Sequence, residues 1–478
     1  MVQNHIKWFI TFFNKFCFLV NTLYDLVMSE IRATNLRMMG FSLPSLGLNM
    51  LVTAVFVILP PLYAEHLGLG AAIGAIFFAA KLVDITASPL WGLFMDSYRT
   101  RWGRRRPWLV LSVPILMLAI FMVYNPPENA GGLYLFVWLA TLYVGWSAWT
   151  ISHTSWALEL SRDYDRRSRI TGLLQAMTMV GGILIGGGWA IMQWITTPTL
   201  EQTASAIGWF MIIALPITVI LCLLSVPERA TPNRPHLGFK KGASLVFTNM
   251  PLLRLLLANF MISFSTYFVQ ALFFFFVAFT LNLQNNTGFI LVFLLVGGLI
   301  GLPVWVRLSE RWTKHSCMQI SVATGAITSL LLLALPSNAV ILTIVAFLLV
   351  GLNSSANEFL PRAMMADVCD HDHIQSGSER MGLYYSLLQA SSKLASGIGV
   401  FLVMSVLGIF EFIPELGPDN TNTALQRLRY LIVTLPMIAY LIVIGLMWRY
   451  PISRERQREM RTIIEERERV AMSSPVDP

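Results

Sequence analysis

The chain has 478 residues, of which 55% are hydrophobic and only 13% are charged, and its formal net charge is +8. Average soluble domains carry about 25% charged residues, so this composition excludes a disordered chain, and it equally excludes a collagen-like fibre. The 4 cysteines are too sparse for a disulfide scaffold or a zinc cluster. The basic excess leaves two classes open, a nucleic-acid-binding protein and a membrane protein with a basic cytoplasmic face.

Apolar residues gather in long runs along the chain. A helix needs about 20 residues to cross a hydrocarbon core of roughly 30 Å. Runs of this length predict twelve membrane-spanning helices, at about 42–64, 71–96, 108–124, 132–158, 170–195, 208–226, 252–281, 288–307, 316–335, 340–360, 381–410 and 428–449. These spans use nearly all of the apolar composition, so the predicted fold class is an all-α integral membrane protein.

The distribution of basic residues predicts the orientation in the membrane, because Lys and Arg are retained on the cytoplasmic side. Every second loop is rich in Arg or Lys, whereas the loops between them contain Arg427 and no other basic residue. Both termini are therefore predicted to be cytoplasmic, in a plasma membrane of the bacterial inner-membrane type. The arginines are spread over separate loops, so we expect no nucleic-acid partner; the predicted partners are the lipid bilayer and a small-molecule substrate, and the chain is expected to be a monomer.

The first forty residues fit this plan less well. Residues 6–28 are apolar, but polar side chains recur among them at helical spacing and form a stripe. That pattern is typical of a helix lying in the membrane interface. The alternative is that Met38 or Met39 is the natural start of the protein.

A short internal repeat divides the chain into two halves. Gly92-Leu-Phe-Met-Asp96 leads to a basic Arg-Trp pair after span 2, and Gly301-Leu-Pro-Val-Trp305 leads to a similar pair after span 8. Two six-helix halves with a binding site between them near the midplane are the plan of major facilitator transporters, which this pattern resembles. The expected segments are an interfacial segment, a first bundle, a central cytoplasmic loop, a second bundle and a cytoplasmic tail, at 1–40, 41–227, 228–250, 251–450 and 451–478.

Three longer motifs resemble one family within that fold. They run from Lys81 through Asp84 and Asp96 to Trp108, from Ala366 through Glu379-Arg380 to Lys393, and over Trp156-Ala-Leu-Glu159. Together they resemble the glycoside–pentoside–hexuronide:cation symporters, the melibiose permease group, over about 41–450. The resemblance implies cation- or proton-coupled symport of a sugar, glycoside or related polar solute by alternating access, with H⁺ or Na⁺ as the coupling ion and no cofactor.

Two alternatives to sugar symport stay open. Relatives of this fold move lysolipids, and several charged sugar-binding positions of the family are neutral here, so one alternative is a carrier of an amphiphile such as a lysolipid. The other is a membrane sensor or binding protein that does not transport. The sequence contains no P-loop, HExxH or GxSxG motif, which argues against an ATP-driven pump or a hydrolase, and no enzyme activity is expected.

Charged residues inside the spans indicate where coupling takes place, since a charge at membrane depth is costly and usually functional. Lys81, Asp84 and Ser88 lie at i, i+3 and i+7, so they share one face of span 2. A carboxylate there can bind a proton or a hard cation, and a nearby ammonium group can compete with it. The predicted coupling residues are Asp84, Lys393, Lys81, Ser88 and Ser152. The alternative is a static ion pair between Asp84 and Lys393.

The predicted substrate-binding residues combine positions taken from the resemblance with polar and aromatic side chains in the spans. Asn49 and Ser152 stand where the family has acids, and Gln175 stands where it has a basic residue, which suits proton coupling better than a sodium site. Trp149, His153 and Trp156 lie at i, i+4 and i+7 on span 4 and could stack against a pyranose ring, although packing is an alternative for the tryptophans. The full predicted set is Asn49, Trp149, His153, Trp156, Gln175, Tyr267, Tyr384 and Gln389.

A third group of charges lies at the predicted cytoplasmic helix ends. Ion pairs there that break on inward opening would act as a two-state gate, and the predicted gating residues are Asp96, Arg101, Arg104, Asp367, Asp370 and Arg380. The nearby run Cys369–His373 has metal-binding residue types, but it lacks a second ligand pair. No metal site is therefore predicted.

Overall fold

Helices make up the named elements of the computed structural model, which describes residues 35–66, 72–97, 100, 102–128, 130–160, 164–196, 198–226, 249–376, 381–452, 455–457, 459–460 and 462–463. Within these ranges, twelve helices are long and apolar enough to cross a membrane, as predicted. The proposed interfacial helix of residues 6–28 lies outside the described residues.

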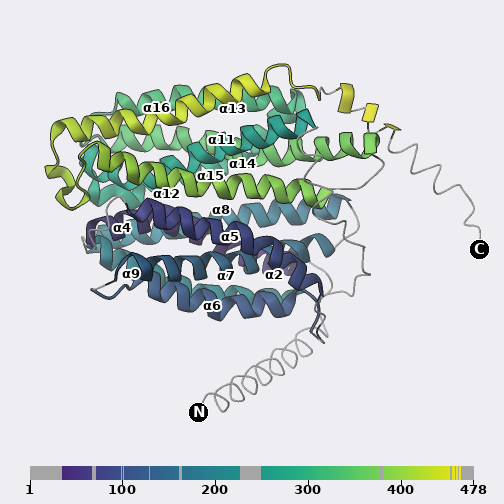
Figure 1. Cartoon of the computed structure of the whole chain (residues 1–478), viewed down its shortest axis with the longest axis horizontal. Coiled ribbons are helices and arrows are strands. Elements are labelled where there is room, and N and C mark those ends of the chain that lie inside the picture. The colour runs from purple at the N-terminus through teal and green to yellow at the C-terminus, as the bar shows by residue number, and fades with distance from the viewer. Residues whose placement is uncertain are drawn as a thin grey trace, which may run out of the picture. The chain divides into compact units, whose positions relative to one another are not determined.

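The helices follow one another in the order of the predicted spans (Figure 1). Span 1 is built from four consecutive pieces, and span 7 ends in a π-helical turn. The elements of the first six spans are α2 (Asn35–Ser42), α3 (Pro44–Thr53), η1 (Ala54–Ile58), α4 (Leu59–His66), α5 (Ala72–Ser97), α6 (Arg106–Tyr124), α7 (Gly132–Glu159), α8 (Tyr164–Ile195) and α9 (Leu200–Ser225). Those of the last six are α11 (Met250–Phe275), η2 (Phe276–Thr280), η3 (Gln284–Asn286), α12 (Thr287–Arg311), α13 (Lys314–Leu333), α14 (Val340–Ser376), α15 (Met381–Ile409), η4 (Pro414–Asp419) and α16 (Asn422–Met447).

Helices α9 and α14 extend furthest beyond the limits predicted from hydropathy. Helix α9 begins about two turns earlier than expected, because Thr199 and Gln202 form a reciprocal capping box, with both hydrogen bonds at 3.2 Å. Helix α14 continues to Ser376, past the expected end near 360. Hydropathy detects only the apolar part of a membrane-spanning helix, whereas the backbone hydrogen bonds of the helix continue into its polar part.

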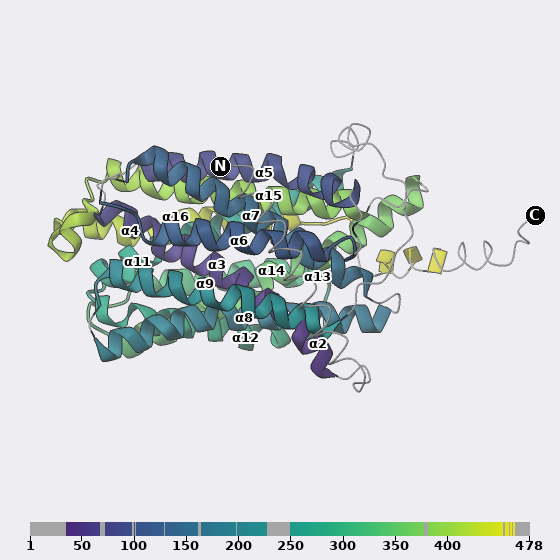
Figure 2. The same cartoon turned by 90° about the horizontal axis from the view of Figure 1, so that it is seen from below.

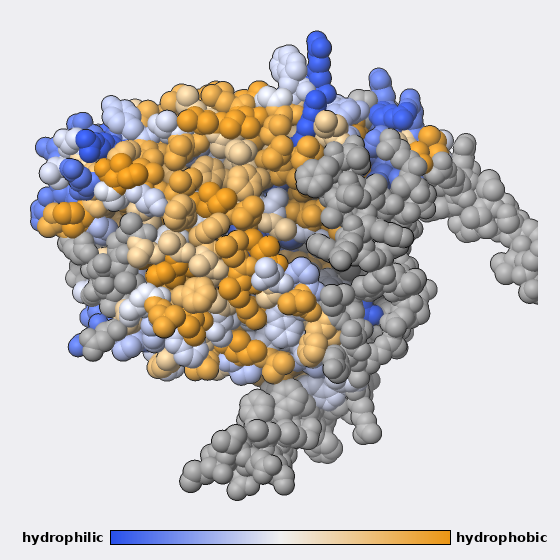
Figure 3. All heavy atoms as spheres, in the orientation of Figure 1, coloured by the Kyte–Doolittle hydropathy of each residue, from blue (hydrophilic) through white to orange (hydrophobic). Residues whose placement is uncertain are grey.

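Apolar side chains cover the middle of the helices on the face seen in Figure 3, and hydrophilic residues gather toward the helix ends. Several large apolar side chains are highly exposed, including Trp194 at 89%, Ile341 at 80% and Leu133 at 76%. So much exposed apolar surface is unusual in a soluble protein, but it is expected where helices face lipid. This distribution matches a protein whose helices are embedded in a bilayer.

Contacts divide the chain into two compact units. Unit 1 comprises Met1–Ala54, Thr86–Ile185 and Thr199–Asn233, and unit 2 comprises Val55–Ile85, Gly186–Pro198 and Arg234–Pro478. The boundaries therefore fall inside η1, α5 and α8, and one end of each of spans 1, 2 and 5 belongs with the last six spans. The division into two six-span halves stays a prediction.

Glycines allow helices α12 and α14 of unit 2 to pack closely. A Cβ at Gly297 or Gly301 of α12 would lie 2.2 Å from a backbone oxygen of α14, and one at Gly351 would lie 1.9 Å from a backbone oxygen of α12. Trp305 of α12 also donates from Nε1 to the carbonyl of Leu352 at 2.9 Å. Gly297 and Gly301 therefore permit close helix packing.

The end of α8 is anchored to the start of α12 within unit 2. The Gln193 amide donates to the carbonyl of Gln284 at 2.7 Å and accepts from the backbone N–H of Gly288 at 2.9 Å. A Cβ at Gly288 would lie 2.6 Å from the backbone nitrogen of Ala190. The Gln193 side chain therefore contacts backbone groups on both sides of the α12 start, and it pairs the Gly288 N–H, a first-turn donor that a helix leaves without an internal partner.

Candidate functional site

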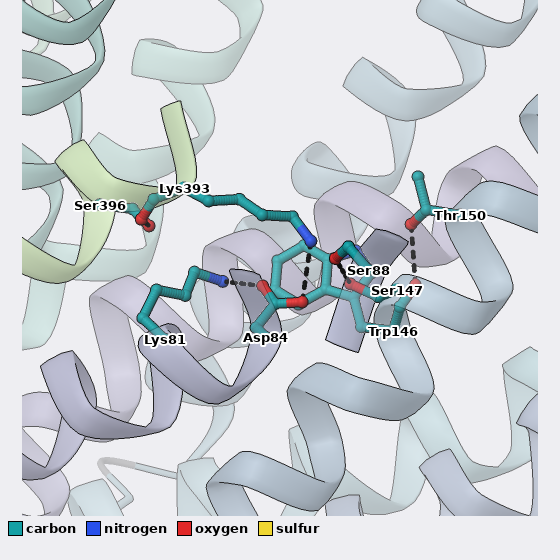
Figure 4. Close-up of polar contacts among 8 residues, drawn as sticks. All are labelled: Lys81, Asp84, Ser88, Trp146, Ser147, Thr150, Lys393 and Ser396. Carbon is teal, nitrogen blue, oxygen red and sulfur yellow. Dashed lines mark hydrogen bonds and ion pairs between the residues drawn. The ribbon is translucent and has the colours of Figure 1, made fainter. Parts of the chain in front are cut away.

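Asp84 of α5 lies between two lysines (Figure 4). Its Oδ2 is 3.1 Å from Nζ of Lys81, and its Oδ1 accepts a hydrogen bond of 2.8 Å from Nζ of Lys393 on α15. Asp84 is 2% exposed and Lys81 is 5% exposed. The first half of α5 and α15 belong to unit 2 and lie side by side in both views (Figures 1 and 2). These three predicted residues therefore form one charged triad, in which Asp84 and Lys81 are buried and Lys393 is half-buried.

Small residues allow α15 to approach α5 near this triad. Gly397 lies one turn after Lys393, and a Cβ there would be 3.1 Å from Cβ of Lys81. Further along the same contact, a Cβ at Gly74 would lie 2.9 Å from backbone atoms of Phe401. The stem of Lys81 is thus held against a glycine, which fixes its ammonium group beside Asp84.

We expect Gly397→Val to displace Lys81 and to lower stability. Overpacking of a closely packed contact costs about 1–3 kcal/mol, and here the added methyl groups would press on the Lys81 stem. Thermal unfolding of the purified protein measures the loss. Gly445→Val on α16 is the matched control, since no atom lies within 4 Å of a Cβ at Gly445, and equal melting temperatures for the two variants would contradict the assignment.

Two aromatic rings lie beside the triad. The Phe56 ring of η1 is 5.8 Å from Nζ of Lys81, and the ring of Tyr267 on α11 is 4.6 Å from Phe56. Tyr267 was a predicted substrate-binding residue, whereas Phe56 was not predicted. Phe56 sits in the π-helical turn of span 1, and such turns occur often at functional sites, but the sequence carries no recognisable signal for the turn.

The two predicted serines lie in different places. Ser88, one turn after Asp84 on α5, has its Oγ 3.2 Å from Oγ of Ser147, a residue that was not predicted. Ser152 donates to the carbonyl of Ala148 at 2.7 Å and lies 3.4 Å from the sulfur of Met95. Met95 is about three turns beyond Asp84 along α5. Ser152 belongs to unit 1 and the triad to unit 2, so its part in coupling stays a prediction.

The aromatic residues of span 4 are enclosed within unit 1. Trp149 and His153 are 0% exposed and Trp156 is 1% exposed. His153 Nε2 is 2.9 Å from the carbonyl oxygen of Phe41, and the Phe41 ring lies 4.9 Å from His153 and 5.0 Å from Trp156. The guanidinium of Arg106 is 5.3 Å from the Trp156 ring. Protein covers these rings in this conformation, and their contact with a solute stays a prediction.

The remaining predicted binding residues differ in burial. Asn49 and Gln175 are half-buried in unit 1. Tyr384 is fully buried in the apolar core of unit 2, and Gln389 is exposed on α15. Tyr384 thus belongs to the packed interior in this conformation, whereas the side chain of Gln389 is exposed.

One of the predicted gating residues has a clear partner. Asp367 of α14 accepts hydrogen bonds from Nζ of Lys314 on α13 at 2.7 and 2.8 Å, and the Gln457 side chain also contacts it. Lys314 was not predicted, because it lies at the start of a span rather than in an arginine-rich loop. Arg104 and Asp370 are half-buried, while Arg101, Arg380 and the side chain of Asp96 lie outside the described residues.

Residues Cys369–His373 do not form a metal site in the described structure. They belong to the extended end of α14, and the part of the chain that the structure describes contains no group of three or more His, Cys, Asp or Glu placed to hold a metal ion. A helix spreads consecutive residues around its axis, which explains why this short run does not converge on one point.

The twelve spans and the charged triad inside them define an integral membrane protein with the major facilitator fold. The chain belongs to the family described as MFS/sugar transport protein, whose model matches residues 40–454. It is 24% identical to the human sodium-dependent lysophosphatidylcholine symporter 1, covering 80% of this chain and 77% of that protein. It is also 24% identical to the isoprimeverose transporter of Lactiplantibacillus pentosus, covering 75% and 77%.

A solved structure agrees with this fold assignment. The bacterial homologue of the human lysosomal transporter Spinster, in its inward-facing and unoccupied conformation, superposes with a TM-score of 0.66 at 13% identity. The match covers 87% of this chain and 97% of that one. At this identity the likeness concerns the fold alone.

Proposed function

We propose that the protein is a secondary active transporter that couples H⁺ or Na⁺ to the symport of a sugar or glycoside by alternating access. The observation that carries this proposal is the charged triad, in which Asp84 of α5 binds Lys393 of α15 at 2.8 Å. Buried charges inside a membrane are costly and are usually retained for function. The sugar-transport family and the isoprimeverose transporter among the relatives support the substrate class.

The triad provides a mechanism for coupling. Each carboxylate oxygen of Asp84 faces one ammonium group, so a cation or proton that binds Asp84 must weaken at least one of these contacts. Loss of the Lys393 contact would loosen α15 from α5 and free an ammonium group for the solute. A ligand that binds one state better than another shifts the equilibrium between them, so ion binding and helix separation are linked.

A lysolipid is the second candidate substrate. It is favoured by the relationship to the sodium-dependent lysophosphatidylcholine symporter 1. Either substrate is compatible with the orientation that we propose, with both termini in the cytoplasm of a bacterial cell and the chain acting as a monomer without a cofactor.

Uptake into proteoliposomes tests the proposed function. The purified full chain is reconstituted, and uptake of labelled isoprimeverose or lysophosphatidylcholine is measured with an imposed H⁺ gradient, an imposed Na⁺ gradient, or none. We expect accumulation of one solute under one gradient only. Solute entry that never exceeds equilibration would contradict coupling, and no uptake of either solute would favour a sensor over a transporter.

A further inference from the structure

The chain that follows α16 turns back onto unit 2. Arg449 has a left-handed backbone, with a φ of 51°, which residues other than glycine rarely adopt. The next residue, Tyr450, is 6% exposed, and its hydroxyl donates to the carbonyl of Pro251 at the start of α11 at 3.0 Å. The turn at Arg449 therefore brings the tail against the first turn of α11.

The described tail residues beyond this turn have one covered face and one exposed face. Gln457 and Met460 lie at i and i+3, so they share a helix face, and Met460 is 1% exposed. Glu455, Arg456 and Glu459 are exposed, and the last two form an ion pair at 3.0 Å. In both views the short yellow turns of the tail lie near the end of α14 (Figures 1 and 2). This pattern is typical of a polar helix that packs against protein along one face.

Asp367 of α14 joins the tail to α13. Its Oδ1 accepts a hydrogen bond from the Gln457 amide, and its two carboxylate oxygens accept from Nζ of Lys314 at 2.7 and 2.8 Å. The same ammonium group donates to the carbonyl of Ala363 at 3.2 Å. Asp367 is 7% exposed, and hydrogen bonds to a charged group are stronger than those between neutral groups. The tail is thus fixed to the carboxylate that holds the start of α13 against α14.

The tail also contributes to the apolar core at this end of unit 2. Tyr450, Ile452 and Met460 belong to the same buried cluster as Cys317 of α13 and Cys369 of α14. The two cysteines are 0% and 7% exposed. Detachment of the tail would remove three side chains from this cluster, so a reagent would then reach the two thiols more easily.

We propose that residues 450–460 form a strap that closes the end of unit 2 where α11 and α13 begin and α14 ends. The strap must detach before these helix ends separate, and its attachments are the Tyr450 hydroxyl on α11, the Gln457 amide on α14 and the buried Met460 side chain. Proteins open locally when a few contacts break, so the strap sets how often this end opens. The basic loops predict that the end is cytoplasmic. The inference goes beyond the proposed function, because it depends neither on the substrate nor on the coupling ion.

Thiol labelling of the purified full chain in detergent tests the strap without a substrate or a gradient. N-ethylmaleimide is added, and the labelling rate of each cysteine is read from the mass of its peptide. Cys317 and Cys369 report on the strapped end. Cys222, a buried free cysteine near the end of α9 in unit 1, reports on the rest of the protein. Modification of a buried group follows the population of the open form when opening and closing are fast.

Two variants weaken different attachments. Gln457→Ala removes a hydrogen bond to a charged group, so we expect Cys317 and Cys369 to be labelled about tenfold to a hundredfold faster, with Cys222 unchanged. Tyr450→Phe removes a hydrogen bond between neutral groups and should raise both rates by about twofold to tenfold.

Glu455→Ala is the matched control, because Glu455 is exposed on the same segment, and its rates should equal those of the wild type. Rates in Gln457→Ala that equal those of Glu455→Ala would overturn the proposal. An equal rise at Cys222 would also overturn it, since the whole protein would then be loosened. Tyr450→Phe decides by the same criteria if Gln457→Ala does not fold.

Discussion

Asp84→Asn is expected to reduce gradient-driven uptake to the level of passive equilibration. Asparagine can accept a hydrogen bond from one of the two lysines through its single carbonyl oxygen, while its NH2 group faces the other lysine as a donor. It has no negative charge with which to bind a cation, and it does not take up a proton near neutral pH. Exchange of labelled for unlabelled solute across the membrane should continue, because exchange needs no net ion movement. Parallel measurements of accumulation and exchange in the same proteoliposomes separate these two effects.

Glu201→Gln is the control for this substitution. Glu201 is an exposed acid in the first turn of α9, far along the chain from the triad, and its variant should accumulate solute like the wild type. Accumulation by Asp84→Asn at the wild-type level would show that the triad is a static ion pair.

Asp84→Ala is expected to destabilise the protein more than the loss of either lysine. Removing one partner of a buried ion pair costs about 3–5 kcal/mol, because the remaining charge is left uncompensated. Here the substitution leaves two ammonium groups without their carboxylate. Lys393→Ala should cost less, since Asp84 keeps Lys81 at 3.1 Å and the Lys393 side chain is already 24% exposed.

A double-mutant cycle checks the origin of this effect. Thermal unfolding of Asp84→Ala, Lys81→Ala and the double variant gives the coupling energy between the two residues. We expect the double variant to recover part of the stability lost in Asp84→Ala, because the buried ammonium of Lys81 is removed as well. Additive losses in the double variant would indicate that the pair is not energetically coupled.

The sequence was sufficient to predict those parts of the structure that depend on hydropathy and on charge in the spans. Twelve apolar runs gave the helices, and the cost of charge at membrane depth singled out Asp84 with Lys81 and Lys393. The contact between Gly397 and Lys81 was not predictable, because a sequence does not show which helices meet.

The cytoplasmic limit of span 10 was missed for a physical reason. Hydropathy ended the span near 360, whereas the helix continues through polar residues to Ser376. The role of Ser152, which was grouped with the triad from a family position, stays a prediction; its hydroxyl donates to the carbonyl of Ala148 on its own helix. Side chains with an available carbonyl one turn earlier often take that local partner instead of a distant one.

The central claim is that Asp84 binds the coupling ion in exchange for its lysine contacts. Ion entry during solute uptake tests it most directly in proteoliposomes that have no imposed gradient, with a pH-sensitive dye trapped inside or labelled sodium added outside. We predict that adding the transported solute outside drives inward movement of one of the two ions in the wild type and of neither in Asp84→Asn. Solute entry without ion movement in the wild type, or equal ion entry in Asp84→Asn, would contradict the claim.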